Sequence, residues 1–153
     1  MQLHAVERYQ YNCVQLYYAA VCSCAMQLHE AGLPYFLKLL AIETLAELKG
    51  AGRAFAILGD MKELGAYEEF AHVEIGRAVV SGKIDFLATV GPMMRYAALE
   101  ALESGVGADW IEPCKTPEEA AAWTVKRLMP GDWVLVMGSR SMEMERAVEA
   151  LRG

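Results

Sequence analysis

Two short glycine-led segments hold the residues best suited to chemistry. The segment GDMKELG contains Asp60 and Lys62, and the segment GSRSM contains Ser139 and Arg140. A carboxylate such as Asp60 suits the hydroxyl groups of a ribose, whereas lysine and arginine suit the oxygens of phosphates or carboxylates. A purely structural reading stands beside this one, because Asp60 could cap the turn behind it and a strand-to-helix turn needs little more than glycine.

Each of these segments follows an apolar run of the length expected for a buried strand. We expect four strands, in the runs Ala54–Gly59, Phe86–Gly91, Asp109–Pro113 and Trp133–Gly138. Residues at helical spacing follow every run, and strands that are apolar throughout and alternate with helices indicate a parallel sheet covered on both faces. The sequence therefore predicts a three-layer, Rossmann-like α/β fold over residues 37–153, with helices on both faces of a mostly parallel sheet.

Two helix starts matter for the site. Thr116-Pro117-Glu118-Glu119 has a capping hydroxyl, a proline in the first turn and a glutamate that can reach back, which predicts a helix start. The last helix is expected to begin directly after Gly-Ser-Arg, so that Arg140 would open a helix whose free amide groups attract anions. A third glycine-led segment, GPMM, follows the second apolar run. Its glycine is better explained by the turn alone.

Parallel sheets bind ligands beyond the carboxyl ends of their strands. The segments that hold Asp60 and Lys62 and that hold Ser139 and Arg140 both leave such ends, so we expect them at one edge of the sheet. His72 follows the first segment, and we expect it to be a surface or helix-packing residue rather than an acid–base catalyst.

Composition sets limits on partners. The chain has 153 residues, the size of one ordinary domain, and a formal net charge of −6, which disfavours nucleic acid as a partner. The four cysteines show no metal-binding spacing and indicate reduced thiols in a cytoplasmic protein. The longest apolar stretch, Cys13–Leu28, has 16 residues, fewer than the ~20 that a membrane span needs.

Four stretches together resemble the carboxyl-terminal domain of the Mur ligase family. They are AIETLAELKGAGRAFAILGDMKELG, HVEIGR, IDFLATVG and PGDWVLVMGSRSMEMERAVEAL, and they cover about Ala41 to Leu151. The pair LGDMxELG and GSRxMxME is specific, whereas either motif alone would only be suggestive.

The resemblance implies an ATP- and magnesium-dependent ligase of cell-wall peptidoglycan synthesis, and so a role in cell shape and division. In the family, a carboxylate is converted to an acyl phosphate and then attacked by an amine. The nearest branch joins D-alanyl-D-alanine to UDP-N-acetylmuramoyl tripeptide. By position, Asp60 and Lys62 resemble residues near the nucleotide, and Ser139 and Arg140 resemble those facing the acceptor or the dipeptide. The resemblance assigns no catalytic residue and no metal ligand to this chain.

Two departures from the family are visible. The family's last strand usually ends in lysine before Gly-Ser-Arg, where this chain has Met137. Residues 1–36 match nothing in the family, and we expect them to form a divergent, partly helical segment. We expect a helix within Cys13–His29 that covers the sheet edge left bare by a missing family strand, or that packs on a second copy of the chain.

The chain contains no phosphate-binding GxxxxGK[ST] loop. The family carries that loop and the UDP-sugar site on an amino-terminal and a central domain, so we expect these as partners and no turnover without them. Two other functions stay open: a sister ligase with another amino-acid substrate, and a non-catalytic Rossmann-like module that binds a nucleotide or a protein.

Overall fold

A six-stranded sheet with the strand order β1-β2-β6-β3-β4-β5 organises the chain. The computed structural model describes residues 3–5, 12–16 and 33–153, with side chains from Leu37 onward. The strands are β1 (Leu3–Ala5), β2 (Asn12–Leu16), β3 (Ala54–Gly59), β4 (Phe86–Val90), β5 (Ile111–Cys114) and β6 (Trp133–Met137). Neighbouring strands from β2 to β5 pair in parallel, and β1 pairs antiparallel with β2.

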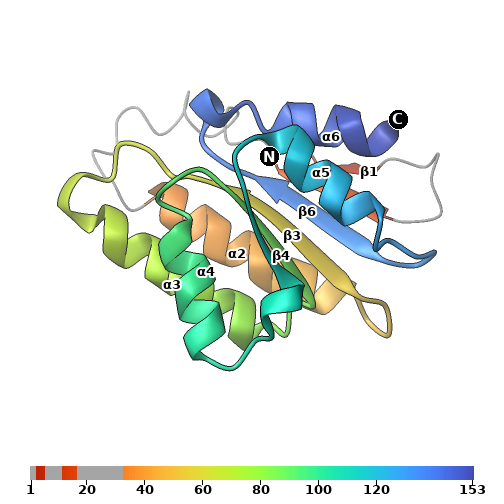
Figure 1. Cartoon of the computed structure of the whole chain (residues 1–153), viewed down its shortest axis with the longest axis horizontal. Helices are drawn as coiled ribbons and strands as arrows, with labels where there is room; N and C mark the ends of the chain where they lie inside the picture. Colours follow the sequence, from red (N-terminus) through yellow and green to blue (C-terminus); the bar gives the residue numbers. More distant parts are fainter. Residues whose placement is uncertain (1–2, 6–11, 17–32) are drawn as a thin grey trace.

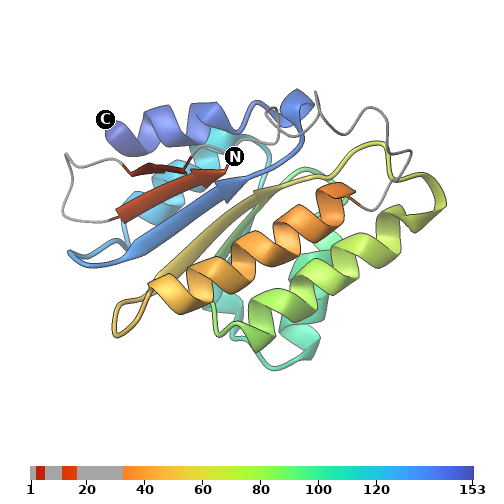
Figure 2. The same cartoon turned by 180° about the vertical axis from the view of Figure 1, so that it is seen from behind.

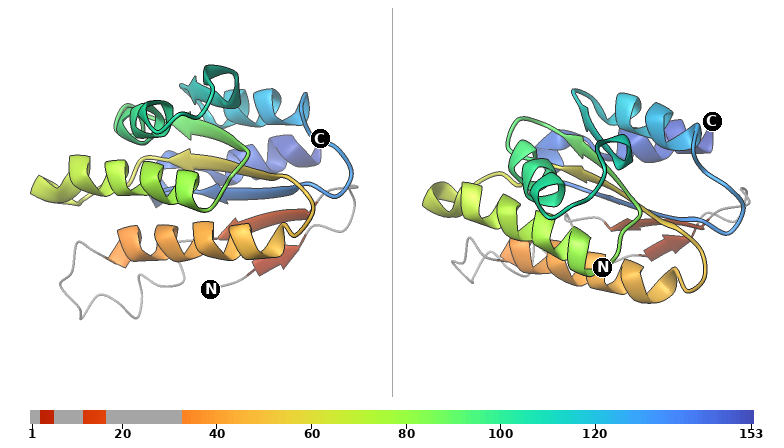
Figure 3. Two further views of the ribbon diagram at one scale, coloured as in Figure 1. Left: turned by 90° about the horizontal axis from the view of Figure 1, so that it is seen from below. Right: turned by 60° about the horizontal axis from the view of Figure 1, so that its bottom comes forward.

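Helices cover both faces of this sheet. Figure 2 shows α2 (Leu33–Leu48) and α3 (Glu68–Ser81) in front of the sheet, and α4 (Arg95–Glu103) packs against α3. The opposite face carries α5 (Pro117–Val125) and α6 (Glu145–Arg152) (Figure 1). Figure 3 shows the resulting layers, with α2 on one side of the sheet and α5 on the other. The predicted three-layer α/β fold is confirmed.

Strand β3 shows why these residues form a central strand. All six of its residues are buried, as expected for a strand covered on both faces. Ala54, Ala56 and Leu58 belong to the core beneath α2, α3 and α4, whereas Phe55 and Ile57 belong to the core beneath α5 and α6. The alternation follows the two-residue period of a strand.

The predicted elements between Ala54 and Val125 lie close to the observed ones. The weak third strand begins at Ile111, after a short 3-10 turn at Ala108–Trp110. The Thr116 hydroxyl accepts the Glu119 amide, as expected for the cap of this helix, whereas the Glu119 carboxylate accepts the amide of Lys115, one residue before the cap.

The prediction that a helix begins directly after Gly-Ser-Arg is wrong. A 3-10 turn (Arg140–Met142) comes first, Glu143 then adopts a left-handed conformation with φ of 50°, and α6 begins only at Glu145. A residue in that conformation cannot continue a right-handed helix.

The amino-terminal segment also differs from expectation. Asn12–Leu16 is a strand, and it pairs in parallel with β6, so a strand occupies the sheet edge that we expected a helix to cover (Figure 2). Helix α2 begins at Leu33, a few residues before the expected start of the domain. The remainder of the helix predicted within Cys13–His29 lies outside the described residues. No helix in the described part of the chain is long and apolar enough to span a membrane.

Candidate functional site

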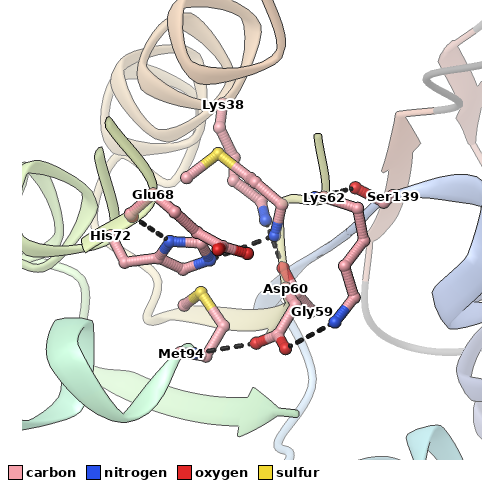
Figure 4. A network of polar contacts seen from close by, with 9 residues as sticks. Lys38, Gly59, Asp60, Lys62, Glu68, His72, Met94 and Ser139 are labelled. Carbon is pink, nitrogen blue, oxygen red and sulfur yellow. Dashed lines mark hydrogen bonds and ion pairs between the residues drawn. The ribbon is translucent and has the colours of Figure 1, made fainter. Parts of the chain in front are cut away.

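The carboxyl ends of β3, β4 and β6 bring the two glycine-led segments together. In the sheet, Leu58 lies opposite Met137 and Gly59 lies opposite Val90. The backbone that leaves β3 therefore runs between the loop after β6 and the loop after β4. Figure 4 shows the polar contacts that hold it there. The expectation that both segments share one edge of the sheet is met.

Asp60 is fully buried at this edge. Its side chain is 0% exposed, although it is a carboxylate. Oδ1 accepts a hydrogen bond from the Met94 amide at 2.8 Å, and Oδ2 pairs with the Lys62 ammonium at 3.2 Å. Met94 immediately precedes α4, so Asp60 satisfies an amide at the amino end of that helix, a position that favours negative charge. Asp60 thus caps a neighbouring loop rather than the turn that follows it.

Ser139 ties its loop to the segment after β3. Its hydroxyl oxygen accepts the Lys62 amide at 2.8 Å, and its own amide donates to the Asp60 carbonyl at 3.1 Å. These two bonds run in opposite directions between the segments. They fix the position of the Ser139 hydroxyl oxygen, and they do not use the hydrogen that the hydroxyl itself can donate.

Lys62 and Arg140 are the cations that the two glycine-led segments offer to solvent. The Lys62 side chain is 40% exposed despite its contact with Asp60. Arg140 is exposed, and its side chain makes no hydrogen bond or ion pair with any residue that the structure describes. Glu143, the neighbour that could have neutralised Arg140, instead pairs with Arg146 at 3.3 Å. The two cations are therefore suited to binding an anion.

Two further titratable residues, Lys38 and His72, lie beneath the site. Sequence reasoning missed the role of Lys38, whereas it expected His72 to be a surface or helix-packing residue. Lys38 of α2 is 1% exposed, and its ammonium donates to the Gly59 carbonyl (Figure 4). Burial lowers the pKa of Lys38 from 10.5 to about 7, against the opposing effect of the Asp60 charge. A lysine between Leu37 and Ala41, on the apolar side of a predicted helix, was the only hint in the sequence.

His72 is buried within the helix packing rather than on the surface. Its Nε2 accepts the Met61 amide at 3.1 Å, so that nitrogen carries no proton. Its Nδ1 lies 2.6 Å from the Glu68 carbonyl and donates to it. Burial is the main cause that lowers the pKa of His72 below 6.5, with the Lys38 charge acting in the same direction. The residue is neutral and satisfied, as a helix-packing histidine should be.

Met137 lies beneath the site and is uncharged. Its side chain is 4% exposed and belongs to the apolar core under α2. A fixed positive charge at this position is therefore absent, as the sequence indicated. The Lys38 ammonium lies instead at the end of β3, the strand paired with β6.

The charge and exposure of Lys62 and Arg140 suit an anion, but the site offers little for catalysis. Among residues 37–153, no three histidine, cysteine, aspartate or glutamate side chains are placed to hold a metal ion. Burial raises the pKa of Cys114 to about 11, so this thiol is protonated at neutral pH. The exposed cations and the glycine turns fit the phosphate groups of a nucleotide and the carboxylate of a peptide.

Comparisons with known proteins show the family to which the chain belongs. The sequence model of the family described as "Mur ligase, glutamate ligase domain" matches residues 40–140, a span that includes both glycine-led segments. The chain belongs to the Mur ligase family. Two curated relatives are named UDP-N-acetylmuramoyl-tripeptide–D-alanyl-D-alanine ligase. The one from Bacillus subtilis is 32% identical over 111 residues, which are 72% of this chain and 24% of the relative. The one from Escherichia coli is 35% identical over 115 residues, 73% of this chain and 23% of the relative.

A solved structure of the family shares the fold. It is the MurF ligase from Thermotoga maritima in complex with ADP, with a TM-score of 0.64 and 22% sequence identity. The match covers 97% of this chain and 30% of that structure. The chain spans about a quarter of the length of the curated relatives it matches. The Mur ligase assignment therefore concerns one domain of a larger family architecture.

Proposed function

We propose that this chain acts as the carboxyl-terminal domain of an ATP-dependent ligase that joins D-alanyl-D-alanine to UDP-N-acetylmuramoyl tripeptide. The observation that carries the proposal is the 32–35% identity to two curated ligases of that name. The two segments that follow β3 and β6 lie together, and we expect them to contact the substrates of such a ligase. A cytoplasmic location follows from the proposal, because ATP and nucleotide-linked precursors are found there.

Within this function, Lys62 is the residue we assign to the nucleotide. Its ammonium is partly exposed, and a lysine ammonium is a suitable partner for phosphate oxygens. Asp60 is buried and bonded to Lys62, so we propose that it acts on the nucleotide through Lys62 rather than by direct contact. ATP supplies the phosphoryl group that activates the acceptor carboxylate. The described residues offer no cluster of metal ligands, so we assign magnesium binding to other domains of the ligase.

Arg140 and Ser139 are the residues we assign to the peptide substrates. The Arg140 guanidinium can form two parallel hydrogen bonds with a carboxylate, such as that of the acceptor or of D-alanyl-D-alanine. Ser139 orients the Lys62 amide and lies beside Arg140 in the same loop. The domain would thus hold the nucleotide and the peptide on neighbouring loops of one sheet edge.

A hybrid enzyme tests the proposal. Leu33–Gly153 would be joined to the amino-terminal and central domains of the B. subtilis relative, so that α2 and Lys38 are retained. ADP release would be measured with UDP-N-acetylmuramoyl tripeptide, ATP, magnesium and D-alanyl-D-alanine. We expect release that requires both substrates, and none from the isolated chain.

The same assay separates the alternatives. Release with a single amino acid but not with D-alanyl-D-alanine would indicate a sister ligase of the family. A folded hybrid without any ADP release, beside an active parent enzyme, would contradict a ligase function and favour a non-catalytic binding module.

A further inference from the structure

The backbone around Asp60 is held at consecutive peptide groups. The Asp60 amide donates to Val90, the Asp60 carbonyl accepts from Ser139, and the Lys62 amide donates to the Ser139 hydroxyl. Two more groups of this segment, the Gly59 carbonyl and the Met61 amide, have partners that are side chains. Buried side chains from two different helices satisfy these two groups.

The first of these side chains is Lys38 of α2. It is fully enclosed, yet its Nζ reaches the Gly59 carbonyl at the end of β3. A buried amine is costly unless its donors are used, and apolar side chains could fill a helix face more cheaply. An amine donates to a carbonyl whether or not it is protonated, so this contact persists through neutral pH.

The second side chain is His72 of α3. Its Nε2 accepts the Met61 amide, and its Nδ1 donates to the Glu68 carbonyl one turn earlier. The ring therefore bridges α3 and the segment after β3. Only the neutral ring with its proton on Nδ1 can make both contacts.

We propose that Lys38 and His72 are positioning residues, which fix the peptide groups on either side of Asp60 and thereby set where the Lys62 ammonium lies. Figure 4 shows both side chains converging on this segment from α2 and α3, opposite Ser139. Rigid support of this kind places a binding group in advance and so reduces the entropy that is lost when the ligand binds. The positioning of the backbone stands on the described contacts alone, whereas its consequence for ATP rests on the proposed function.

Acid should release one of the two contacts. Protonation of Nε2 would set an N–H group against the Met61 N–H and remove the acceptor. The charged groups that face His72 are Lys38 from α2, Asp60 after β3 and Glu68 of its own helix. Lys38 opposes a second positive charge, while the two carboxylates favour it. Burial keeps the ring neutral, so the contact is lost only below pH 6.5.

Amide hydrogen exchange in the full chain tests the proposal at two matched variants. His72→Gln keeps an acceptor near the place of Nε2, whereas His72→Asn keeps a polar group only near Nδ1. We expect His72→Asn to lower the protection of the Met61 amide by roughly tenfold, which corresponds to one hydrogen bond of about 1.4 kcal/mol. His72→Gln should retain it, and the Ile57 amide in the middle of β3 should keep its protection in both variants.

The pH dependence of amide protection separates a positioning role from a packing role, because a residue that only packs would not change it. In the unchanged chain, protection of the Met61 amide should fall as the pH is lowered below 6.5, and in His72→Gln it should not. For Lys38, the carbonyl carbon resonance of Gly59 should shift with pH near 7 and should lose that dependence in Lys38→Met.

Three results would overturn the proposal. They are equal loss of protection at Ile57 and Met61 in His72→Asn, failure of His72→Gln to retain protection, and a Gly59 resonance indifferent to Lys38→Met. In the hybrid enzyme, His72→Asn should raise the KM for ATP and His72→Gln should restore it. An inactive hybrid with the expected exchange pattern would contradict the proposed function while leaving the positioning role intact.

Discussion

The carboxyl group of Asp60 lies directly against the backbone of Gly91. A Cβ atom built on Gly91 would stand 2.5 Å from Cγ of Asp60, and Gly91 has a φ of +103°, which L side chains rarely adopt. The glycine after β4 is thus required for more than its turn. It leaves the space in which the buried carboxylate can reach the Met94 amide.

Replacing Gly91 should therefore disturb both residues. In Gly91→Ala, backbone strain of about 1–3 kcal/mol adds to the displacement of Asp60. We therefore expect the free energy of unfolding to fall by about 2–3 kcal/mol or more. Urea unfolding measures this loss. Gly105→Ala is the matched control, since Gly105 also has a positive φ, +96°, but has no atom within 4 Å of an added Cβ. Equal losses in both variants would show that the contact with Asp60 is unimportant.

The buried Lys38 predicts a specific dependence of stability on pH. Its pKa is about 7 in the folded chain and 10.5 when exposed, so between these values the unfolded chain binds more protons. The free energy of unfolding must then rise with pH over this range, by at most about 1.4 kcal/mol per pH unit. Lys38→Met removes this contribution, and its stability relative to the unchanged chain should be greatest at pH 7 and decline toward pH 10.

Urea unfolding at several pH values between 7 and 10 measures that decline. Lys126→Met replaces an exposed lysine and should differ from the unchanged chain by the same amount at every pH. A constant difference for Lys38→Met as well would mean that the Lys38 amine is not desolvated.

The strands and the family could be predicted from the sequence because their causes are local. AFAILG is apolar at every position, which a strand buried on both faces requires, and the capping residues at Thr116 act within one turn. The site depends on contacts between distant residues. Asp60 finds its partner 34 positions away at Met94, and Lys38 finds its partner 21 positions away at Gly59. The place of Lys38 on the apolar side of its helix hints at burial, but its partner at the end of β3 appears only in the packed structure.

The amino-terminal strand and the delayed start of α6 have similar explanations. Asn12–Leu16 is a strand because β6 offers it an open edge, although the apolar residues around it read equally well as a helix. Glu143 ends the 3-10 turn in a left-handed conformation that glutamate rarely adopts, so composition could not indicate it.

The ion pair between Arg53 and Asp132 lies far from the site, and we expect it to contribute more to stability than the exposed ion pairs do. Arg53 donates to both oxygens of the Asp132 carboxylate, at 3.1 Å and 2.6 Å, and Asp132 is 4% exposed. Burial alone would raise the pKa of Asp132, but the hydrogen bonds from Arg53 and Met129 and the Arg53 charge outweigh it and lower the pKa below 3.8. Arg53→Met would leave a buried, largely unpaired carboxylate, at a cost of about 2–3 kcal/mol near pH 7.

Acid should reduce the difference in the free energy of unfolding between Arg53→Met and the unchanged chain. A carboxyl group with a lowered pKa contributes stability above pH 3.8, and that contribution is lost as the pH falls through its folded value. Urea unfolding at pH 7 and pH 3 tests this. Arg77→Met is the control, because its ion pairs with Glu74 and Glu100 are exposed and should contribute under about 1 kcal/mol. Equal costs for the two arginines would contradict the role of burial.

Arg140 and Lys62 should affect activity and leave stability unchanged. In the hybrid enzyme, Arg140→Ala removes a guanidinium that has no partner among the described residues, so the melting temperature should stay constant. If the guanidinium binds a substrate carboxylate, the lost charge-assisted hydrogen bond is worth about 1.5–3 kcal/mol, and kcat/KM should fall by about tenfold or more. Lys62→Ala should act mainly on the KM for ATP, while Arg140→Ala should act on a peptide substrate.

Arg146→Ala supplies the control for a change of charge alone. Arg146 pairs with Glu118 and Glu143, so its loss should lower stability slightly and leave kcat/KM within about twofold. A hybrid in which Arg140→Ala and Arg146→Ala behave alike would reduce Arg140 to a surface residue. If Arg140→Ala raised the KM for ATP instead, the loop after β6 would face the nucleotide, and the division of the two loops between nucleotide and peptide would be wrong.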